Sequence, residues 1–279
     1  MIKYELLPQQ LIYEGTCTSD NFFEPCLPND KYLVAVHDPV YYYDLLNLKI
    51  PYKEARKIGF PLSEQLVERE RIIADGTMKA CEFSLKKGIA MNIAGGTHHA
   101  FSSRGEAFCM LNDQAIGARY LQSKKLADQI LIIDLDVHQG NGTAEIFKDD
   151  PSVFTFSMHG ANNYPFKKES SDLDIALKKG TTDLEYLSVL KDALTNLFRE
   201  VRPEFVFYLC GVDILETDKL GTLSLSLEGC KKRDELVLES CLQHQIPVQC
   251  SMGGGYSRDI KKIVEAHANT FRLAQQMYF

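Results

Sequence analysis

The sequence has no CxxC pair, no excess of positive charge and no apolar run long enough to cross a membrane. A membrane-spanning helix needs roughly 20 consecutive apolar residues, and the start of the chain lacks the charged and apolar segments of a signal peptide. The eight cysteines show no metal or redox spacing, and Cys210 and Cys250 lie within apolar runs. We therefore expect reduced core thiols and a cytoplasmic location, with the nucleus as the alternative in a eukaryotic host.

The charge balance argues against a nucleic-acid-binding surface. The formal net charge is −7, whereas non-specific binding of a polyanion depends on clustered lysine and arginine. A cationic substrate is compatible with this balance. The 279 residues contain no low-complexity tract, linker or repeat, and they are enough for a substantial core. We expect one domain over residues 1–279.

Apolar patterns alternate between strands and helices after an irregular start. A short strand is expected near residues 2–7, and residues 32–37 fit either a strand or a short helix that Pro39 closes. The alternation predicts an α/β fold with a mostly parallel central sheet and helices on both faces. Further strands are expected at 89–93, 129–134, 153–157, 205–210 and 247–250, and helices at 61–87, 108–122, 184–200, 228–243 and from about 256 past 274.

The stretch 129–143 joins a buried strand to a polar cluster. Its Ile and Leu run is typical of a strand covered on both faces. Asp134, Asp136 and His138 follow at intervals of two, and alternate residues of an extended segment point to the same side. Burying two carboxylates and an imidazole together without a cation is costly. This stretch therefore predicts a metal site.

Other polar residues also follow predicted strands, and the carboxyl ends of parallel strands share one edge of a sheet. Asp213 adds a third donor to Asp136 and His138, and three oxygen and nitrogen ligands with open positions are typical of a catalytic zinc. The alternative is that the two acids cap turns and that His138 is a core histidine. Two bridged metal ions typically need a further aspartate two residues beyond the histidine and another two residues beyond the second acidic ligand. Those positions hold Gly140 and Leu215, so a single metal ion is favoured. The side chains expected at this edge are His98, His99, Asp134, Asp136, His138, His159, Asp213 and Tyr256.

His98 and His99 follow a Gly-Gly break and are candidates for acid and base. We expect Asp134 to orient His98 and Asn141 to orient His99, which gives the two imidazoles different proton affinities. A surface histidine pair is the alternative.

Tyr256 ends the triple-glycine turn 253–255, where a phenol could stabilise an oxyanion; a helix start is the alternative. We count Gly254 of this turn among the substrate-binding candidates.

Five motifs in order resemble the zinc-dependent histone deacetylase family over essentially the whole chain. The Gln-Gly-Asn-Gly and Asp-Ile-Leu-Glu segments, with Leu-Ser-Leu-Ser after them, are most similar to the class IV branch and its bacterial relatives. The resemblance implies the single-domain, three-layer arginase/deacetylase fold and hydrolysis of Nε-acyl-lysine or a related amide. The matching segments are 95–99, 108–113, 134–142, 211–220 and 253–256.

The resemblance also implies roles for individual residues. Asp136, His138 and Asp213 match the zinc ligands, with ferrous iron as the alternative metal, and His98 and His99 match the tandem acid/base pair. Tyr256 matches the tyrosine that polarises the carbonyl, Phe108 matches one wall of the acyl-lysine tunnel, and Tyr164 is the candidate for the other. A structural potassium ion is expected at backbone carbonyls of 134–138 and 157–158.

Three functions follow from these residues. The leading one is a deacylase of acetyl-lysine or longer fatty acyl-lysine in a protein or peptide. A deacylase of a small acylated amine such as an acetylpolyamine is the second, although Leu220 stands where polyamine-selective relatives have a glutamate. A zinc-containing acyl-lysine binding module without turnover is the third, and Tyr256 and both histidines argue against it. Acyl length and oligomeric state are left open.

Overall fold

The computed structural model describes residues 2–279, and the strands within them form one parallel sheet. Its order is β1-β6-β5-β2-β3-β4, and every neighbouring pair is parallel. The expected α/β fold with a parallel central sheet is confirmed. The strands are β1 (Ile89–Asn92), β2 (Ile130–Asp134), β3 (Val153–Gly160), β4 (Leu173–Leu177), β5 (Phe205–Leu209) and β6 (Val248–Ser251).

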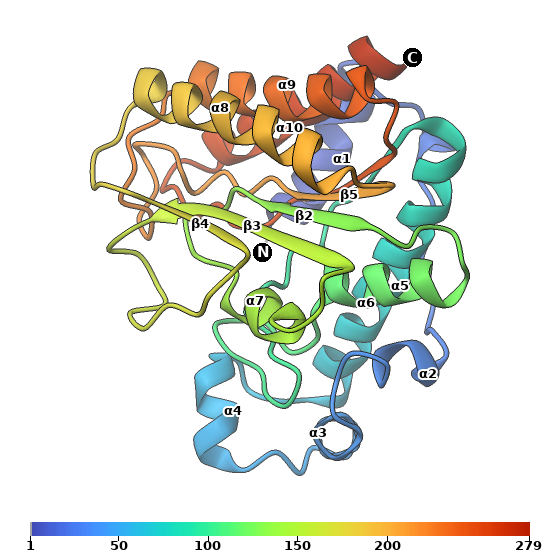
Figure 1. Ribbon diagram of the computed structural model, residues 1–279. Coiled ribbons are helices and arrows are strands. Elements are labelled where there is room, and N and C mark those ends of the chain that lie inside the picture. Colours follow the sequence, from blue (N-terminus) through green and yellow to red (C-terminus); the bar gives the residue numbers. More distant parts are fainter. Residues whose placement is uncertain (1) are drawn as a thin grey trace.

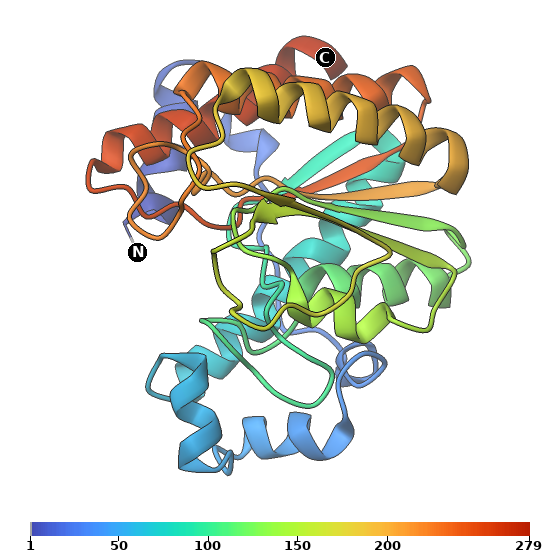
Figure 2. The same ribbon diagram turned by 60° about the vertical axis from the view of Figure 1, so that its left-hand side comes forward.

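Helices cover both faces of the sheet (Figures 1 and 2). One layer consists of α1 (Lys3–Tyr13), α8 (Asp183–Val201), α9 (Leu227–Gln243) and α10 (Ile260–Tyr278). The other layer consists of α5 (Glu64–Lys87), α6 (Asp113–Ser123) and α7 (Asn141–Phe147). Beyond it lie α2 (Asp30–Leu33), α3 (Pro39–Leu46) and α4 (Tyr52–Ile58), and a 3-10 turn, η1 (Ser19–Asn21), precedes them.

The central strands β2 and β5 are buried along their whole length because helices cover both of their faces. From β2 the chain moves outward through β3 to β4, and it then returns to the other side of β2 to form β5 and β6. The strand order therefore reverses between β2 and β5. In open α/β sheets, ligands bind at the carboxyl ends of the strands beside such a reversal. The segments that follow β2 and β5 carry the predicted metal ligands.

Several predicted elements near the start of the chain are wrong. Residues 2–7 are not a strand, because α1 begins at Lys3 and buries Leu7 and Leu11 against α10. Residues 32–37, expected to form a strand or a short helix, are helical only at residues 32 and 33, at the end of α2. Pro39 is the first residue of α3 rather than a terminator, which suits its fixed φ angle.

Two later boundaries also differ from the prediction. The helix expected from Phe108 begins at Asp113, because Phe108 has a φ of 70° and the Asn112 side chain caps the helix by accepting from the Ala115 amide. The strand expected at 153–157 extends to Gly160, and β4 beside it was not predicted.

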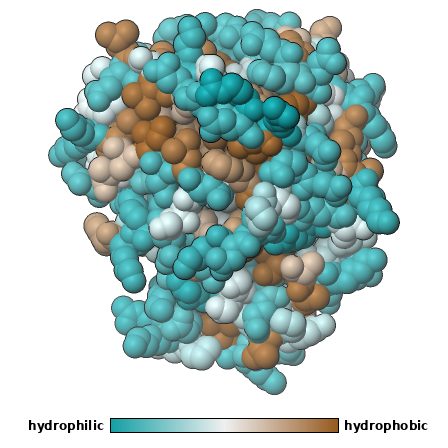
Figure 3. All heavy atoms as spheres, viewed as in Figure 1, coloured by the Kyte–Doolittle hydropathy of each residue, from teal (hydrophilic) through white to brown (hydrophobic). Residues whose placement is uncertain are grey.

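The surface is mainly polar on the face shown in Figure 3, where apolar side chains gather chiefly in its upper left part. Six of the eight cysteines are buried, Cys17 is half-buried and Cys26 is exposed, and all eight are free. Within residues 2–279, no helix combines the length and apolar character needed to cross a membrane.

Candidate active site

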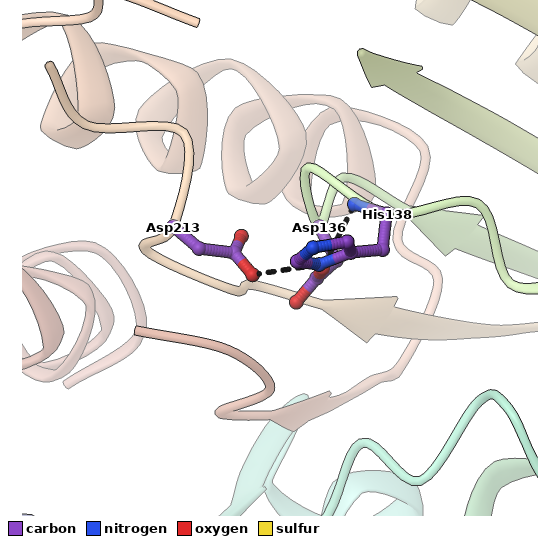
Figure 4. A group of neighbouring side chains, drawn as sticks. All are labelled: Asp136, His138 and Asp213. Carbon is purple, nitrogen blue, oxygen red and sulfur yellow. Dashed lines mark hydrogen bonds and ion pairs between the residues drawn. The ribbon is translucent and has the colours of Figure 1, made fainter. Parts of the chain in front are cut away.

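The side chains of Asp136, His138 and Asp213 meet at the carboxyl edge of the sheet (Figure 4). Asp136 and His138 lie in the segment after β2, and Asp213 follows β5. One potential ligand atom from each residue lies within 4.8 Å of the others. Asp136 is 2% exposed and Asp213 is fully buried. The three predicted ligands therefore form one cluster in which both carboxylates are buried and the His138 side chain is 12% exposed.

This cluster favours positive charge. His138 Nδ1 lies 3.0 Å from Asp136 Oδ1 and 3.2 Å from Asp213 Oδ2. Burial lowers the pKa of His138, but the two carboxylates outweigh burial and raise it to about 10. Burial and the neighbouring Asp136 carboxylate raise the pKa of Asp213. Burial opposes ionisation of Asp136 as well, yet hydrogen bonding from His138 brings the pKa of Asp136 below its usual value.

The donor set fits a transition metal. Two carboxylates and one imidazole are ligands that zinc accepts, and three protein ligands leave positions for water or substrate. Asp213 Oδ2 is buried and, apart from the His138 ring nitrogen 3.2 Å away, has no hydrogen-bond partner within the described chain. A buried carboxylate oxygen with so little compensation is costly, and coordination of a cation removes that cost.

Backbone amides fix the positions of both carboxylates. The amide of Gly254 donates to Asp136 Oδ2 at 2.8 Å, and the amide of Val137 donates to Asp213 Oδ1 at 2.9 Å. A Cβ atom on Gly254 would lie 2.0 Å from Asp213 Oδ2. Glycine is therefore required here by the close approach of the 253–255 turn to the acids.

The two neighbouring histidines have different partners. His98 Nδ1 donates to Asp134 Oδ2, and His99 Nδ1 donates to Asn141 Oδ1, each at 2.6 Å. Burial lowers the pKa of His98, but Asp134 outweighs it and raises the pKa above its usual value. Burial and the adjacent His98 hold the pKa of His99 well below its usual value. The ring centroid of His99 lies 4.0 Å from that of His98 and 6.0 Å from that of His138.

Asp113, the first residue of α6, positions the loop that carries this pair. Its Oδ1 accepts from the amides of Gly96 and Thr97 at 2.9 and 2.8 Å, and its Oδ2 accepts from the Thr77 hydroxyl. The loop after β1 is thus attached to both α5 and α6. It presents the histidines toward the segment after β2, where the amides of residues 142 and 143 donate to the His98 carbonyl.

Tyr256 lines the cavity from the turn after β6. Its amide donates to Asp218 Oδ2 at 2.6 Å, which fixes the backbone, and Lys3 Nζ lies 5.7 Å from its ring. Burial, followed by the charges of Asp136 and Asp213, raises the pKa of its phenol. The phenol therefore stays protonated and can donate a hydrogen bond.

A cavity of about 510 Å³ contains these groups and opens to the surface. Phe108, Phe166 and Leu220 line it and are exposed, so they mark the mouth. Tyr164 lies between the mouth and the histidines, with its ring centroid 5.0 Å from that of His99. Gly254 lines the cavity beside the acids.

His159 does not belong with the other predicted side chains. It lies inside β3 rather than after it, and its ring nitrogen Nδ1 contacts Ser157 Oγ at 3.0 Å.

Glu106 has contacts at the site that the sequence did not indicate. Its Oε2 accepts from the Tyr164 hydroxyl at 2.7 Å and from Asn141 Nδ2 at 3.4 Å. It therefore connects a cavity wall with the partner of His99. A glutamate in a loop between glycine and alanine carries no recognisable spacing, so only the fold reveals this contact.

Comparisons with known proteins point to one family. A profile described as the histone deacetylase domain matches residues 3–271. An uncharacterized protein from Picosynechococcus sp. is 43% identical over 278 residues, which are 100% of this chain and 93% of that protein. Histone deacetylase 2 from Arabidopsis thaliana is 33% identical over 212 residues, which are 75% of this chain and 53% of that protein. The chain thus spans about half the length of this histone deacetylase.

Solved structures give the same result. The crystal structure of a homolog of histone deacetylases from Aquifex aeolicus matches with a TM-score of 0.81 at 26% identity, covering 96% of this chain and 76% of that one. A homolog complexed with SAHA matches with a TM-score of 0.82 at 27% identity and the same coverage.

Glu70 lines the cavity and is a buried carboxyl group. It is 3% exposed, its Oε1 accepts from Arg69, and its Oε2 has no hydrogen-bond partner within residues 2–279. Burial, opposed by Arg69, raises its pKa from 4.5 to about 7. Between pH 4.5 and about 7 the folded protein therefore holds a proton on Glu70 that the unfolded chain has lost. As pH rises through this range, ionisation of the buried group lowers the free energy of unfolding, by about 3 kcal/mol above pH 7.

We expect Glu70→Gln to melt at a higher temperature than the wild type at pH 8, with a much smaller difference at pH 5. Glu68→Gln, an exposed position on the same helix, is the matched control and should show no such pH dependence. Thermal melts of the metal-free proteins at the two pH values measure this. Equal melting of Glu70→Gln and wild type at pH 8 would contradict the prediction.

Proposed function

Since the chain belongs to the histone deacetylase family, we propose that it is a zinc-dependent hydrolase that removes acyl groups from Nε-acyl-lysine. Family membership implies amide hydrolysis, and the lysine substrate and the zinc ion are the finer parts of the proposal. The observation that carries it is the shared cavity, where the ligand cluster lies beside two buried histidines and a protonated phenol.

Asp136, His138 and Asp213 would hold the zinc ion. When bound, the ion would polarise the acyl carbonyl and lower the pKa of a water molecule. Ferrous iron is the alternative metal. A structural potassium ion is further proposed at the carbonyls of 134–138 and 157–158, on the basis of the family resemblance.

The protein's own residues supply the proton transfers. We assign the base to His99, because its Nδ1 donates to Asn141 and leaves Nε2 free to accept a proton from the attacking water. His98 is the alternative base. The water oxygen bonds to the acyl carbon, and the Tyr256 hydroxyl hydrogen-bonds the oxyanion that forms. The C–N bond then breaks, the protonated histidine gives its proton to the lysine amine, and the acid is released.

The mouth supports an acyl-lysine substrate. Phe108, Phe166 and Leu220 offer apolar contacts to the aliphatic part of a lysine side chain. A polyamine carries several charges, which the same apolar surface would disfavour. An acetylpolyamine therefore ranks second as a candidate substrate. A binding module without turnover would need neither the histidine pair nor the phenol.

Other parts of the proposal rest on the sequence. The Gln-Gly-Asn-Gly segment and Asn141 favour the class IV branch, and we propose one catalytic domain over residues 1–279 in a cytoplasmic protein. The partner is an acylated protein or peptide, and no direct contact with nucleic acid is proposed.

We expect Tyr256→Phe to lower turnover about 10²–10³-fold, because one hydrogen bond to the oxyanion is lost. Zinc binding should be unchanged, since the phenol is not a ligand. Tyr43→Phe, at an exposed residue of α3, is the matched control. Initial rates on an acyl-lysine peptide, with zinc content measured on the same samples, test this. Full activity of Tyr256→Phe on every peptide would remove the assigned role.

A panel of acyl groups on one lysine peptide tests the function itself. The zinc-loaded protein is assayed on acetyl-, octanoyl- and myristoyl-lysine, and on an acetylpolyamine. We expect hydrolysis of acyl-lysine that a chelator abolishes and added zinc restores. Hydrolysis of the acetylpolyamine alone would establish the second candidate, and binding of the peptides without turnover would establish the third.

A further inference from the structure

Arg233, in α9, is fully buried and donates to three backbone carbonyls at the carboxyl edge of the sheet. Its Nη1 donates to the carbonyl oxygen of Leu135 at 3.3 Å and to that of Gly211 at 2.5 Å. Its Nη2 donates to the carbonyl oxygen of Cys210 at 3.3 Å. Within residues 2–279, no backbone N–H outside the regular elements donates to these carbonyls. A single guanidinium therefore satisfies three buried acceptors.

These carbonyls belong to the two segments that carry the acidic metal ligands. Leu135 directly precedes Asp136, and Gly211 stands two residues before Asp213. The ladder between β2 and β5 ends at the pair Asp134 and Leu209. Beyond that pair two backbone amides still bridge the segments: the Leu135 amide donates to the Leu209 carbonyl at 3.1 Å, and the Val137 amide donates to Asp213 Oδ1 at 2.9 Å. Arg233 adds a side chain that binds the backbone of both segments where the ladder stops.

The guanidinium is itself fixed by a buried network. Asp234 Oδ1 accepts from Arg233 Nε at 2.9 Å and lies 2.7 Å from Nη2. Asp234 also accepts from the Tyr208 hydroxyl at 2.5 Å and from the Thr270 hydroxyl at 2.7 Å. The arginine is thereby tied to β5 and α10 as well as to its own helix. Its donors point in fixed directions, so small shifts of either ligand segment break hydrogen bonds.

Stability alone is a weak reason for such a pair. Removing two charges from water is costly, and well-packed apolar side chains of similar volume are often as stabilising as a buried ion pair. Arginine differs from lysine in presenting a planar fork of five N–H donors, whereas lysine offers one compact charge. Contact with three carbonyls on two segments needs the fork rather than the charge.

We propose that Arg233 is a positioning residue that sets the separation of Asp136 and Asp213 and thereby the affinity of their site for zinc. This rests on the proposed function in so far as the site is a zinc site. Groups that orient metal ligands typically change metal affinity 10–100-fold when mutated.

Zinc affinity of the full chain, measured by competition with a chromophoric chelator, tests the proposal. We expect Arg233→Lys, which keeps the charge beside Asp234 but loses the fork, to bind zinc about 10–100-fold more weakly than wild type. Thr270→Val is the control, because it removes a hydrogen bond to Asp234 Oδ2, whereas Arg233 contacts Oδ1. It should lower the melting temperature of the metal-free protein while its zinc affinity stays within about twofold of wild type.

Two results would overturn the proposal. One is an affinity of Arg233→Lys within twofold of wild type. The other is a loss of affinity in Thr270→Val as large as that in Arg233→Lys, which would make the effect one of general stability. If Arg233→Lys does not fold, Asp234→Asn takes its place, because it keeps the fork but removes its charged anchor. Its zinc affinity should fall at least threefold, and an unchanged value would overturn the proposal as well.

The outcomes for the two proposals are distinct. Wild-type protein that binds zinc but hydrolyses no acyl-lysine peptide contradicts the proposed function and leaves the role of Arg233 intact. Equal zinc affinities in an active wild type and an active Arg233→Lys contradict the role of Arg233 only. A wild type that binds no zinc contradicts both.

Discussion

Two buried carboxylates at the carboxyl edge of a parallel sheet are the constraint on which the rest of this structure depends. Asp136 and Asp213 are almost completely removed from water, and their ligand atoms lie within reach of one ion. Like charges so placed repel strongly unless positive groups surround them. The neighbouring amides of Val137 and Gly254 and the ring of His138 all present hydrogens to these oxygens. The surroundings are thus organised to hold negative charge around a cation.

The sheet topology determines which segments reach this place. The reversal of strand order between β2 and β5 leaves both strands central, so helices on the two faces bury the strands that lead to the site. It also brings Asp213 beside Asp136 and His138, although these two residues come more than 70 positions earlier in the chain. The loops after β1 and β6 then add the histidine pair and Tyr256. Burial of these side chains strengthens the electrostatic contacts between them, which is what stabilisation of an oxyanion requires.

The sequence was most informative where a local spacing has a direct geometric meaning. Asp136 and His138 stand two residues apart after an apolar strand, and this spacing alone predicts their convergence. The link to Asp213 needed the further assumption of a parallel sheet, which the strand pairing confirms. Local patterns failed where tertiary contacts decide the conformation. Residues 3–7 are helical because α10 offers an apolar face, and α6 starts late because Phe108 adopts a positive φ.

Arg233 shows why part of the site could not be predicted. In the sequence it follows Lys231 and Lys232 and precedes Asp234, which is typical of a solvated helix surface. The structure instead buries Arg233 and Asp234 completely, because that turn of α9 faces the ends of β2 and β5. Glu106 is similar, since its contacts with Tyr164 and Asn141 join segments distant in the chain. Charge patterns alone do not distinguish a surface group from one that satisfies buried carbonyls.

The central claim is that a single cation is held between Asp136, His138 and Asp213. Anomalous diffraction at the zinc edge, on crystals grown with zinc, tests it most directly. The account predicts one strong peak per chain at this cluster, about 2.0–2.2 Å from a carboxylate oxygen of each aspartate and from a ring nitrogen of His138. A peak at other residues only, or two adjacent ions bridged by the acids, would contradict it.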